Sequence, residues 1–369
     1  MNARDQKATE QELKQDILDV LAALRARQEC YPFSMVRNQL KAAKMPTSNG
    51  WPPLIEKFVE MVASRERLLE CREELRRIYL QSLVVGTRAI SIFEVDKREA
   101  NVAAANIDAL LDVTSDFAQA FPLPVSDEKL RKAGFNGVFC AIRKYEDGAV
   151  RLIACCRRAF RTREAIDVAG LDGDAKNALE GFDEVIGVKN GWVQAFDSIV
   201  VRPVEGTIEI QIDIPCRLTR EDFGKARNFY TDRLNGLFGE RFRNEKWLML
   251  PRNLYPLISK LYARNDGYVN SLGHATTTKS IKEERMRGRQ SDLRKETFHE
   301  EGMAAINGAT DEYSIRKGWD TADGQRTPTV LISGHFGAAG GANPQVGYAF
   351  IDGCADEDDF AMVMSKLVL

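Results

Sequence analysis

The chain has 369 residues, of which 44% are hydrophobic, so it is long enough to build two or three domains with filled cores. Its 52 basic and 54 acidic residues give a formal net charge of -2. The overall charge therefore does not favour binding to nucleic acid or to an anionic membrane, and any such binding must depend on a local basic patch. No run approaches the ~20 apolar residues of a membrane-spanning helix, and residues 1–15 lack the apolar core of a signal peptide, so we expect a cytoplasmic protein without membrane contacts.

The cysteines and histidines do not indicate a metal site. Seven cysteines are scattered without a C-x-x-C spacing, which predicts neither a disulfide framework nor a structural zinc site. The three histidines, His274, His299 and His335, fall in the last quarter of the chain but lack the spacing of metal ligands. We therefore predict no metal and no cofactor.

The first 122 residues are predicted to form a helical region. Apolar residues recur at helical spacing, and helices are expected over residues 10–28, 33–44, 54–85 and 96–113. The second and third of these could form a helix-turn-helix with Arg37, Lys41 and Lys44 exposed, although the intervening turn is longer than usual. The Phe-Pro-Leu-Pro segment at 121–124 ends the helical pattern and indicates a domain boundary.

Residues 125–250 are predicted to form an α+β domain with two β-hairpins and a helix. The expected strands are residues 136–145, 149–160, 193–202 and 207–214. Asp147-Gly148 joins the first two, and this dipeptide is typical of a hairpin turn. Thr219, with Asp222 three residues later, is expected to cap the helix that follows.

Residues 251–369 are predicted to form a second α+β domain. The expected strands are residues 267–275, 313–318, 329–333 and 345–352, and the expected helices are 255–263 and 356–366. The predicted fold class is therefore α+β, with a helical N-terminal region followed by two mixed, mainly antiparallel sheet domains.

A phosphate site is a candidate where residue 280 is predicted to begin a helix. Ser280 and Glu283 have the spacing of a capping box, and hydroxyl groups, a lysine and free amides at a helix N-terminus can hold phosphate. The candidate residues are Thr277, Thr278, Lys279 and Ser280. An ordinary cap with exposed threonines explains the same pattern, and the segment is not a Walker motif.

Two local groups of basic residues are candidates for nucleic-acid contacts. One lies on the helix predicted over 280–296 and consists of Lys279, Lys282, Arg285, Arg287, Arg289 and Arg294. The other follows the first hairpin and consists of Arg157, Arg158, Arg161 and Arg163, with Phe160 among them. Such residues could neutralise phosphates and stack on bases, or they could pair with nearby acids on a solvated surface.

An enzymatic alternative rests on the second hairpin. Asp197 on one strand and Glu209 on the next, with Gln211 two residues later, resemble the metal-dependent PD-(D/E)xK nucleases, in which carboxylates on adjacent strands hold Mg²⁺. The third residue here is glutamine where that pattern has lysine, and no Pro-Asp precedes. The polar face of any amphipathic strand would carry the same residues.

The central region also resembles a known component of anti-phage defence. The predicted elements follow one another in a fixed order: a strand pair joined by Asp147-Gly148, the segment 195–200, a second turn and a helix. This order is similar to the layout of the DNA-binding B subunit of the Kiwa system. The resemblance covers residues 135–240 and is one of element order. It implies DNA binding within a defence complex and assigns no role to individual residues.

These observations favour a non-enzymatic nucleic-acid-binding or accessory subunit, with nucleic acid and a protein partner or a second copy of the chain as expected partners. A Mg²⁺-dependent nuclease or other hydrolase using Asp197 and Glu209 is the first alternative, and only that alternative requires a metal. A protein-interaction scaffold built on the long helices is the second.

Overall fold

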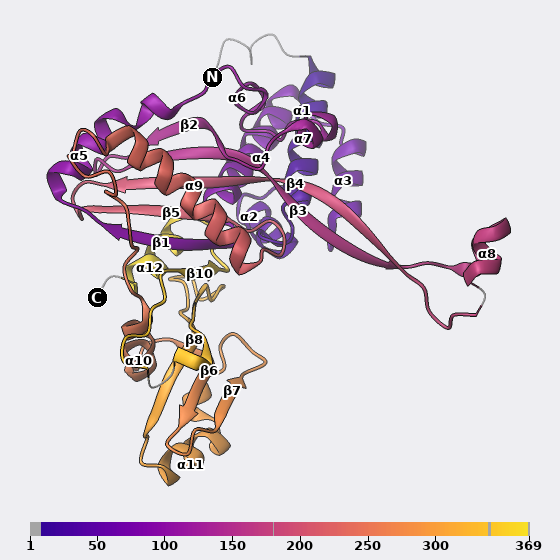
Figure 1. Cartoon of the computed structure of the whole chain (residues 1–369). Coiled ribbons are helices and arrows are strands. Elements are labelled where there is room, and N and C mark those ends of the chain that lie inside the picture. The colour runs from indigo at the N-terminus through magenta and orange to yellow at the C-terminus, as the bar shows by residue number, and fades with distance from the viewer. Residues whose placement is uncertain (1–8, 180, 339–340, 368–369) are drawn as a thin grey trace.

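The structure of the protein is a computed structural model that describes residues 9–179, 181–338 and 341–367. Its centre is one ten-stranded sheet in the order β2-β3-β4-β5-β1-β10-β9-β8-β6-β7, and each neighbouring pair is antiparallel (Figure 1). The strands are β1 Arg88–Glu94, β2 Val138–Lys144, β3 Val150–Ala165, β4 Ile186–Arg202, β5 Thr207–Asp213, β6 Tyr268–Thr276, β7 Ile281–Arg285, β8 Thr310–Gly318, β9 Thr329–Ser333 and β10 Ala349–Asp352. The α+β fold class is confirmed, and the strands of both predicted sheet domains belong to this one sheet.

Helices cover much of both sheet faces. They are α1 Glu10–Ala26, α2 Phe33–Ala42, α3 Trp51–Glu60, α4 Arg65–Val85, α5 Lys97–Asn106, α6 Asp116–Ala120, α7 Asp127–Lys132, α8 Gly173–Leu179, α9 Arg220–Phe238, α10 Tyr255–Ala263, α11 Thr297–Ala305 and α12 Glu357–Ser365. In the described part of the chain, none of these helices combines the length and the apolar character needed to cross a membrane.

The N-terminal helical region is confirmed, with one correction to its longest helix. Residues 54–85 are not continuous, because α3 ends at Glu60 and α4 begins at Arg65. Ser64 has extended backbone angles, and its side chain accepts a hydrogen bond from the Arg67 amide. A serine in that position is a favourable N-cap, and it starts a new helix where apolar periodicity alone predicts one long helix.

The sequence did not predict β1, which lies inside the region assigned to helices. This strand pairs with β5 along all seven of its residues and with β10 through Arg88, Ala89 and Ile90. It is buried on both faces, so it lacks the polar and apolar alternation by which half-buried strands are recognised. β1 therefore joins the two predicted sheet domains into one sheet.

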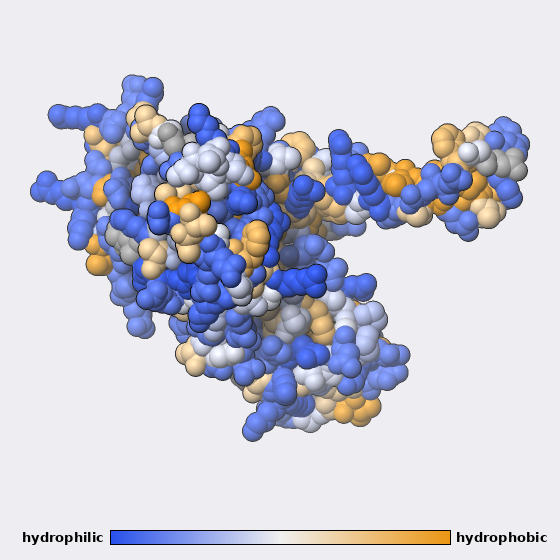
Figure 2. Space-filling view, turned by 90° about the horizontal axis from the view of Figure 1, so that it is seen from below, coloured by the Kyte–Doolittle hydropathy of each residue, from blue (hydrophilic) through white to orange (hydrophobic). Residues whose placement is uncertain are grey.

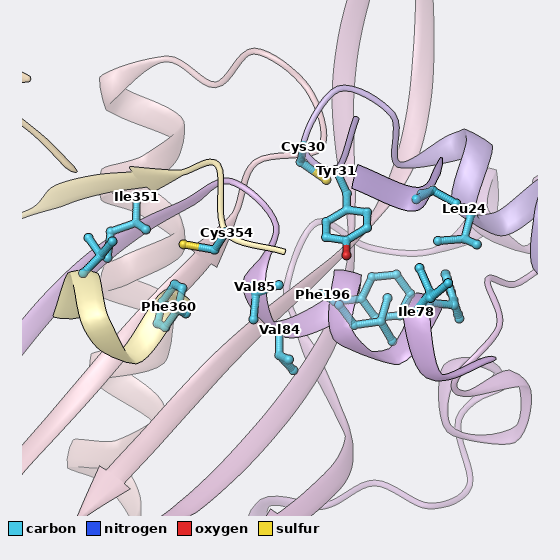
Figure 3. Packing of buried hydrophobic residues seen from close by; sticks show 14 of the residues in the cluster. Leu24, Cys30, Tyr31, Ile78, Val84, Val85, Phe196, Ile351, Cys354 and Phe360 are labelled. Carbon is cyan, nitrogen blue, oxygen red and sulfur yellow. The ribbon is translucent and has the colours of Figure 1, made fainter. Parts of the chain in front are cut away.

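Two hydrophobic clusters fill the two sides of the sheet. One contains α5, α9 and residues such as Ile199 and Ile210. The other contains α1–α4, α10 and α12, and Figure 3 shows Phe196 of β4 and Phe360 of α12 in this same cluster. Because α12 at the end of the chain packs against α4, the N-terminal region is not an independent unit.

The helix predicted over residues 280–296 is wrong. Residues 281–285 form β7, an edge strand that pairs with β6 from Ser271↔Arg285 to Ala275↔Ile281. Each residue of Lys282-Glu283-Glu284-Arg285 is charged. A strand and a helix are told apart by the spacing of their apolar residues, and this segment has none. The pairing with β6 decides the outcome.

The hairpin of β3 and β4 extends much further than predicted. Its ladder runs from Val150↔Val201 to Ala165↔Ile186, whereas the sequence predicted strands only as far as 160 and from 193. The outer part projects from the body as a two-stranded arm that ends near α8 (Figure 1), and hydrophobic side chains lie along it in Figure 2. The exposed apolar residues there are Ile166, Phe182, Ile186 and Val188.

Candidate nucleic-acid interface

The C-terminal half of the sheet has one covered face and one open face. Leu272, Ile315 and Val330 point into the core formed with α10 and α12. On the other face, Ser271 lies opposite both Arg285 and Arg316 in the strand registers. The polar residues of this alternation form the floor of a hollow, which is therefore a product of the strand pattern.

This first hollow has a volume of about 340 Å³ and is rich in arginine. The arginines that line it are Arg285, Arg287, Arg289 and Arg316. Asp352 neutralises part of this charge, because its carboxylate lies 2.5 Å from Arg316 Nη1 and 3.2 Å from Arg289 Nη1. Within the described residues, Arg287 is exposed and has no ion-pair partner. Glu283 also lines the hollow and pairs with Arg285 at 3.6 Å, so Arg287 is the lining arginine best placed to accept an anionic ligand.

Two further hollows continue from the first along the same side of the sheet. The second, of about 130 Å³, shares Leu331 and Ser333 with the first and is also lined by Arg220 and by the aromatic residues Phe223, Tyr348 and Phe350. The third, of about 360 Å³, shares Leu218 with the second and lies at the base of the arm. We refer to these three connected hollows as the sheet groove.

The third hollow combines cations with aromatic rings. Phe135, Phe229, Arg157 and Lys225 are among its lining residues. The Arg157 guanidinium lies 4.2 Å from the centroid of the Trp192 ring and 4.5 Å from that of Phe135, so it is stacked between two aromatic groups. The guanidinium also donates to the Arg131 carbonyl of α7, and Arg157 pairs in the ladder with Gln194, whose side chain accepts from the Val125 amide, so its charge points to the sheet face opposite α9. Lys225 is the lysine that lines this hollow from α9.

The structure separates the four predicted arm arginines. Arg161 and Arg163 are exposed on the arm, whereas Arg158 is buried in an ion pair with Asp197. Burial acts to lower the pKa of the Arg158 guanidinium, but the Asp197 carboxylate outweighs this effect and raises it. Arg158 is thus a structural cation, and Arg157, Arg161 and Arg163 remain at the surface.

The predicted phosphate site has no helix to support it. Residues 277–280 belong to the turn between β6 and β7, where Lys279 has a φ of 63° and the Lys279 amide donates to the Thr276 carbonyl. The helix N-terminal amides that the prediction required are therefore absent from this described segment. Thr277, Thr278, Lys279 and Ser280 are exposed on a hairpin turn, and Lys282 is exposed on β7.

Arg294 also differs from its predicted role. Its guanidinium pairs with Asp292 at 2.7 Å and donates to the carbonyl oxygens of Arg264 and Gly267. This side chain joins the loop after α10 to the short 3-10 helix Leu293–Lys295. It holds the fold together and has little exposure to a partner.

The structure does not bring together the residues of the nuclease alternative. Asp197 lies on the α9 side, where Tyr230 Oη donates to its Oδ2 at 2.7 Å and Arg158 pairs with it. Glu209 pairs with Arg202 at 2.5 Å and accepts from Gln211 Nε2 at 2.6 Å. The register pairs Ser198 with Gln211, so Asp197 and Glu209 point to opposite faces of the sheet. No Mg²⁺ can bridge them in this arrangement.

Several groove residues were not identified from the sequence. Arg220, Arg316 and Tyr348 come from α9, β8 and the segment before β10, and only the strand order brings them together. In the sequence, only the alternation of the polar residues Ser314 and Arg316 with the apolar residue Ile315 indicated that this strand has a polar face.

Comparison with protein-family models gives no match for this chain, and comparison with curated proteins gives none either. The resemblance of residues 135–240 to the Kiwa B subunit therefore stays a prediction. Any functional conclusion rests on the geometry of the sheet groove.

Proposed function

We propose that this protein binds single-stranded nucleic acid along the sheet groove. The observation that carries the proposal is the continuity of the three hollows, which links Lys225 at the base of the arm through Arg220 to Arg285, Arg287 and Arg289 at the far end. The last three belong to one of the two basic groups that the sequence suggested. Cations along one path can follow a phosphate backbone.

The aromatic residues favour a single strand over a duplex. Phe229, Phe135, Tyr348 and Phe350 line the groove between its cationic positions. Unpaired bases stack on such rings with any sequence, whereas the bases of a duplex are already stacked on one another. The combination therefore predicts binding with little sequence preference.

The groove is long enough for several nucleotides. Eight strand-to-strand steps separate β3 from β7 in the sheet order, and at about 4.8 Å for each step the path is about 38 Å. OB folds, a different kind of single-strand-binding domain, cover about 4–16 nucleotides each, so a path of this length is in the usual range. The proposed function is binding, and the expected protein partner and role in anti-phage defence stay predictions.

Fluorescence anisotropy with a labelled single strand of about 20 nucleotides, repeated across a salt series, tests the proposal. The single strand should bind more tightly than a duplex of the same sequence. The double variant Arg285→Glu/Arg287→Glu should weaken binding and reduce the slope of log K against log salt by about 1.4, since each lost phosphate contact removes about 0.7.

A matched control is the double reversal Arg37→Glu/Lys41→Glu on α2, which changes the charge equally at exposed positions. This control should bind as the unmodified protein does. Loss of binding in the control but not in the groove variant would replace the proposal by the helix-turn-helix alternative. Absence of binding at low salt would contradict both.

A further inference from the structure

Two of the three histidines meet a glutamate beneath α11, on the side of the sheet opposite the groove. His274 comes from β6, Glu284 from β7 and His299 from α11. Glu284 lies opposite Leu272, a residue of the core, in the register of β6 and β7. Three elements that are separate in the sequence thus direct these side chains to one point.

The three side chains are close enough to share one ion. Glu284 Oε1 lies 2.8 Å from His274 Nε2 and 3.0 Å from His299 Nδ1. One ligand atom from each residue falls within 4.8 Å of the others. Both histidine side chains are almost fully buried, at 3% and 2% exposure, which limits competition from solvent.

One neighbour of the cluster can orient a metal-binding histidine. Tyr262 Oη lies 2.8 Å from His299 Nε2. In the tautomer with its proton on Nε2, the imidazole donates a hydrogen bond to Tyr262, and Nδ1 can bind a metal ion in place of its contact with Glu284. His274 Nδ1 is buried and has no hydrogen-bond partner among the described residues.

We propose that His274, Glu284 and His299 bind a divalent first-row transition metal ion of the Zn²⁺ type. Two imidazoles and one carboxylate form a donor set that such ions prefer over Mg²⁺ or Ca²⁺. Metal bonds of about 2.0–2.1 Å in a tetrahedron separate ligand atoms by about 3.3 Å. The observed 2.8 and 3.0 Å therefore require these two pairs to open by a few tenths of an ångström, and the two imidazole nitrogens, which lie within 4.8 Å of each other, must reach the same separation.

A position for a further ligand is available beside the cluster. A cavity of about 110 Å³ adjoins it and is lined by the two histidines, Glu284, Thr276 and Met303 among others. A space of this size holds water. Three protein ligands with one water complete a four-coordinate site, and the ion would tie β6, β7 and α11 together.

Metal titration of the full chain tests this site. After treatment with a chelator, the protein should bind one Zn²⁺ in competition with a chromophoric chelator, and Co²⁺ should give a visible spectrum without the near-ultraviolet bands of thiolate ligands. Glu284→Gln and His299→Ala should each weaken binding at least 100-fold. Tyr262→Phe keeps all three ligands and should weaken it by about 10- to 100-fold.

His335→Ala is the matched control, because His335 is exposed and lies outside the cluster. It should bind the ion as the unmodified protein does. Thermal unfolding provides a second measurement, since Zn²⁺ should raise the melting temperature of the unmodified protein and of His335→Ala but not of Glu284→Gln. Failure of the unmodified protein to bind either ion, or equal affinity in Glu284→Gln, would show that these residues are only a hydrogen-bonded His-Glu-His group.

Discussion

Arg27, the residue that caps the end of α1, forms a buried two-point ion pair with Asp213 at the end of β5. Arg27 Nη1 lies 2.9 Å from Asp213 Oδ2, and Arg27 Nη2 lies 3.0 Å from Oδ1. Nη2 also donates to the Ser82 carbonyl of α4 at 2.8 Å, and Asp213 accepts from the Phe196 amide of β4 at 2.9 Å. One ion pair thus links two N-terminal helices to two strands of the sheet.

Removal of one member of this pair should be severely destabilising. Arg27→Met leaves the Asp213 carboxylate buried without its cation, and loss of one partner from a buried pair typically costs about 3–5 kcal/mol of the free energy of unfolding. The double variant Arg27→Met/Asp213→Asn should lose less than the sum of the single variants. Urea unfolding measures all three, and additive losses would show that the two residues are not coupled.

Asp266 should give the protein a defined dependence on acid. Burial acts to raise its pKa, but hydrogen bonds from Lys366, Lys317 and Trp319 and the charge of Lys317 outweigh this and lower it to about 2, from an ordinary value of 3.8. Because the pKa is lower in the folded state, its stabilisation is complete above about pH 4 and is lost as the pH falls towards 2.

The comparison with Asp266→Asn isolates this contribution. Above pH 4 the variant should be less stable than the unmodified protein, and the difference should shrink between pH 4 and pH 2. Asp174→Asn, at an exposed position on the arm, should be equal to the unmodified protein throughout. Denaturant unfolding at each pH provides the measurement, and a difference that stays constant with pH would contradict the assignment.

The exposed arginines of the arm should matter only for long nucleic acids. Arg161 and Arg163 lie beyond the third hollow, so a strand that only fills the groove would not reach them. Arg161→Glu/Arg163→Glu should leave the affinity for a short strand unchanged and reduce the salt slope by about 1.4 for a long one. Arg161→Lys/Arg163→Lys retains the positive charges and should not change the affinity for either length. If the glutamate variant loses the same affinity for short and long nucleic acids in the anisotropy assay, this arrangement is wrong.

Two glycines should respond in opposite ways to alanine. Gly236 is exposed in α9, and a β-carbon added there would meet open space, so Gly236→Ala should stabilise the protein by about 0.5–1 kcal/mol. Gly267 has a φ of +63°, and an added Cβ would lie 2.3 Å from the Gly318 carbonyl oxygen. Gly267→Ala should therefore destabilise the protein by more than about 1 kcal/mol. Thermal or urea unfolding distinguishes the two outcomes.

Local patterns were sufficient for many elements of the fold. The Asp147-Gly148 turn lies between β2 and β3 as predicted, and Thr219 forms a complete capping box with Asp222 at the start of α9. Helix α10 and strand β9 also have their predicted bounds. For the turn, the capping box and α10, the deciding interaction joins residues close in the sequence, so the information is local.

The missed elements depend on distant partners. The outer arm, where Arg161 and Glu164 lie, has no apolar alternation and is a strand only because β4 pairs with it. β7 is likewise defined by β6. Because residues 280–296 were predicted as a helix, Glu284 was not placed beside His274 and His299, and the cluster could not be anticipated from histidine spacing.

The connection between β1 and β10 is, together with that between β10 and β9, the narrowest part of the sheet. β1 pairs with β5 over seven residues but with β10 over only three, from Arg88↔Ile351 to Ile90↔Ala349. Few backbone hydrogen bonds must break to open this connection, so amide exchange should be faster there than at the centre of the β3 and β4 ladder. The sheet groove crosses this connection. A single-stranded nucleic acid bound in the groove would contact both sides of it and should therefore slow amide exchange in β1 and β10.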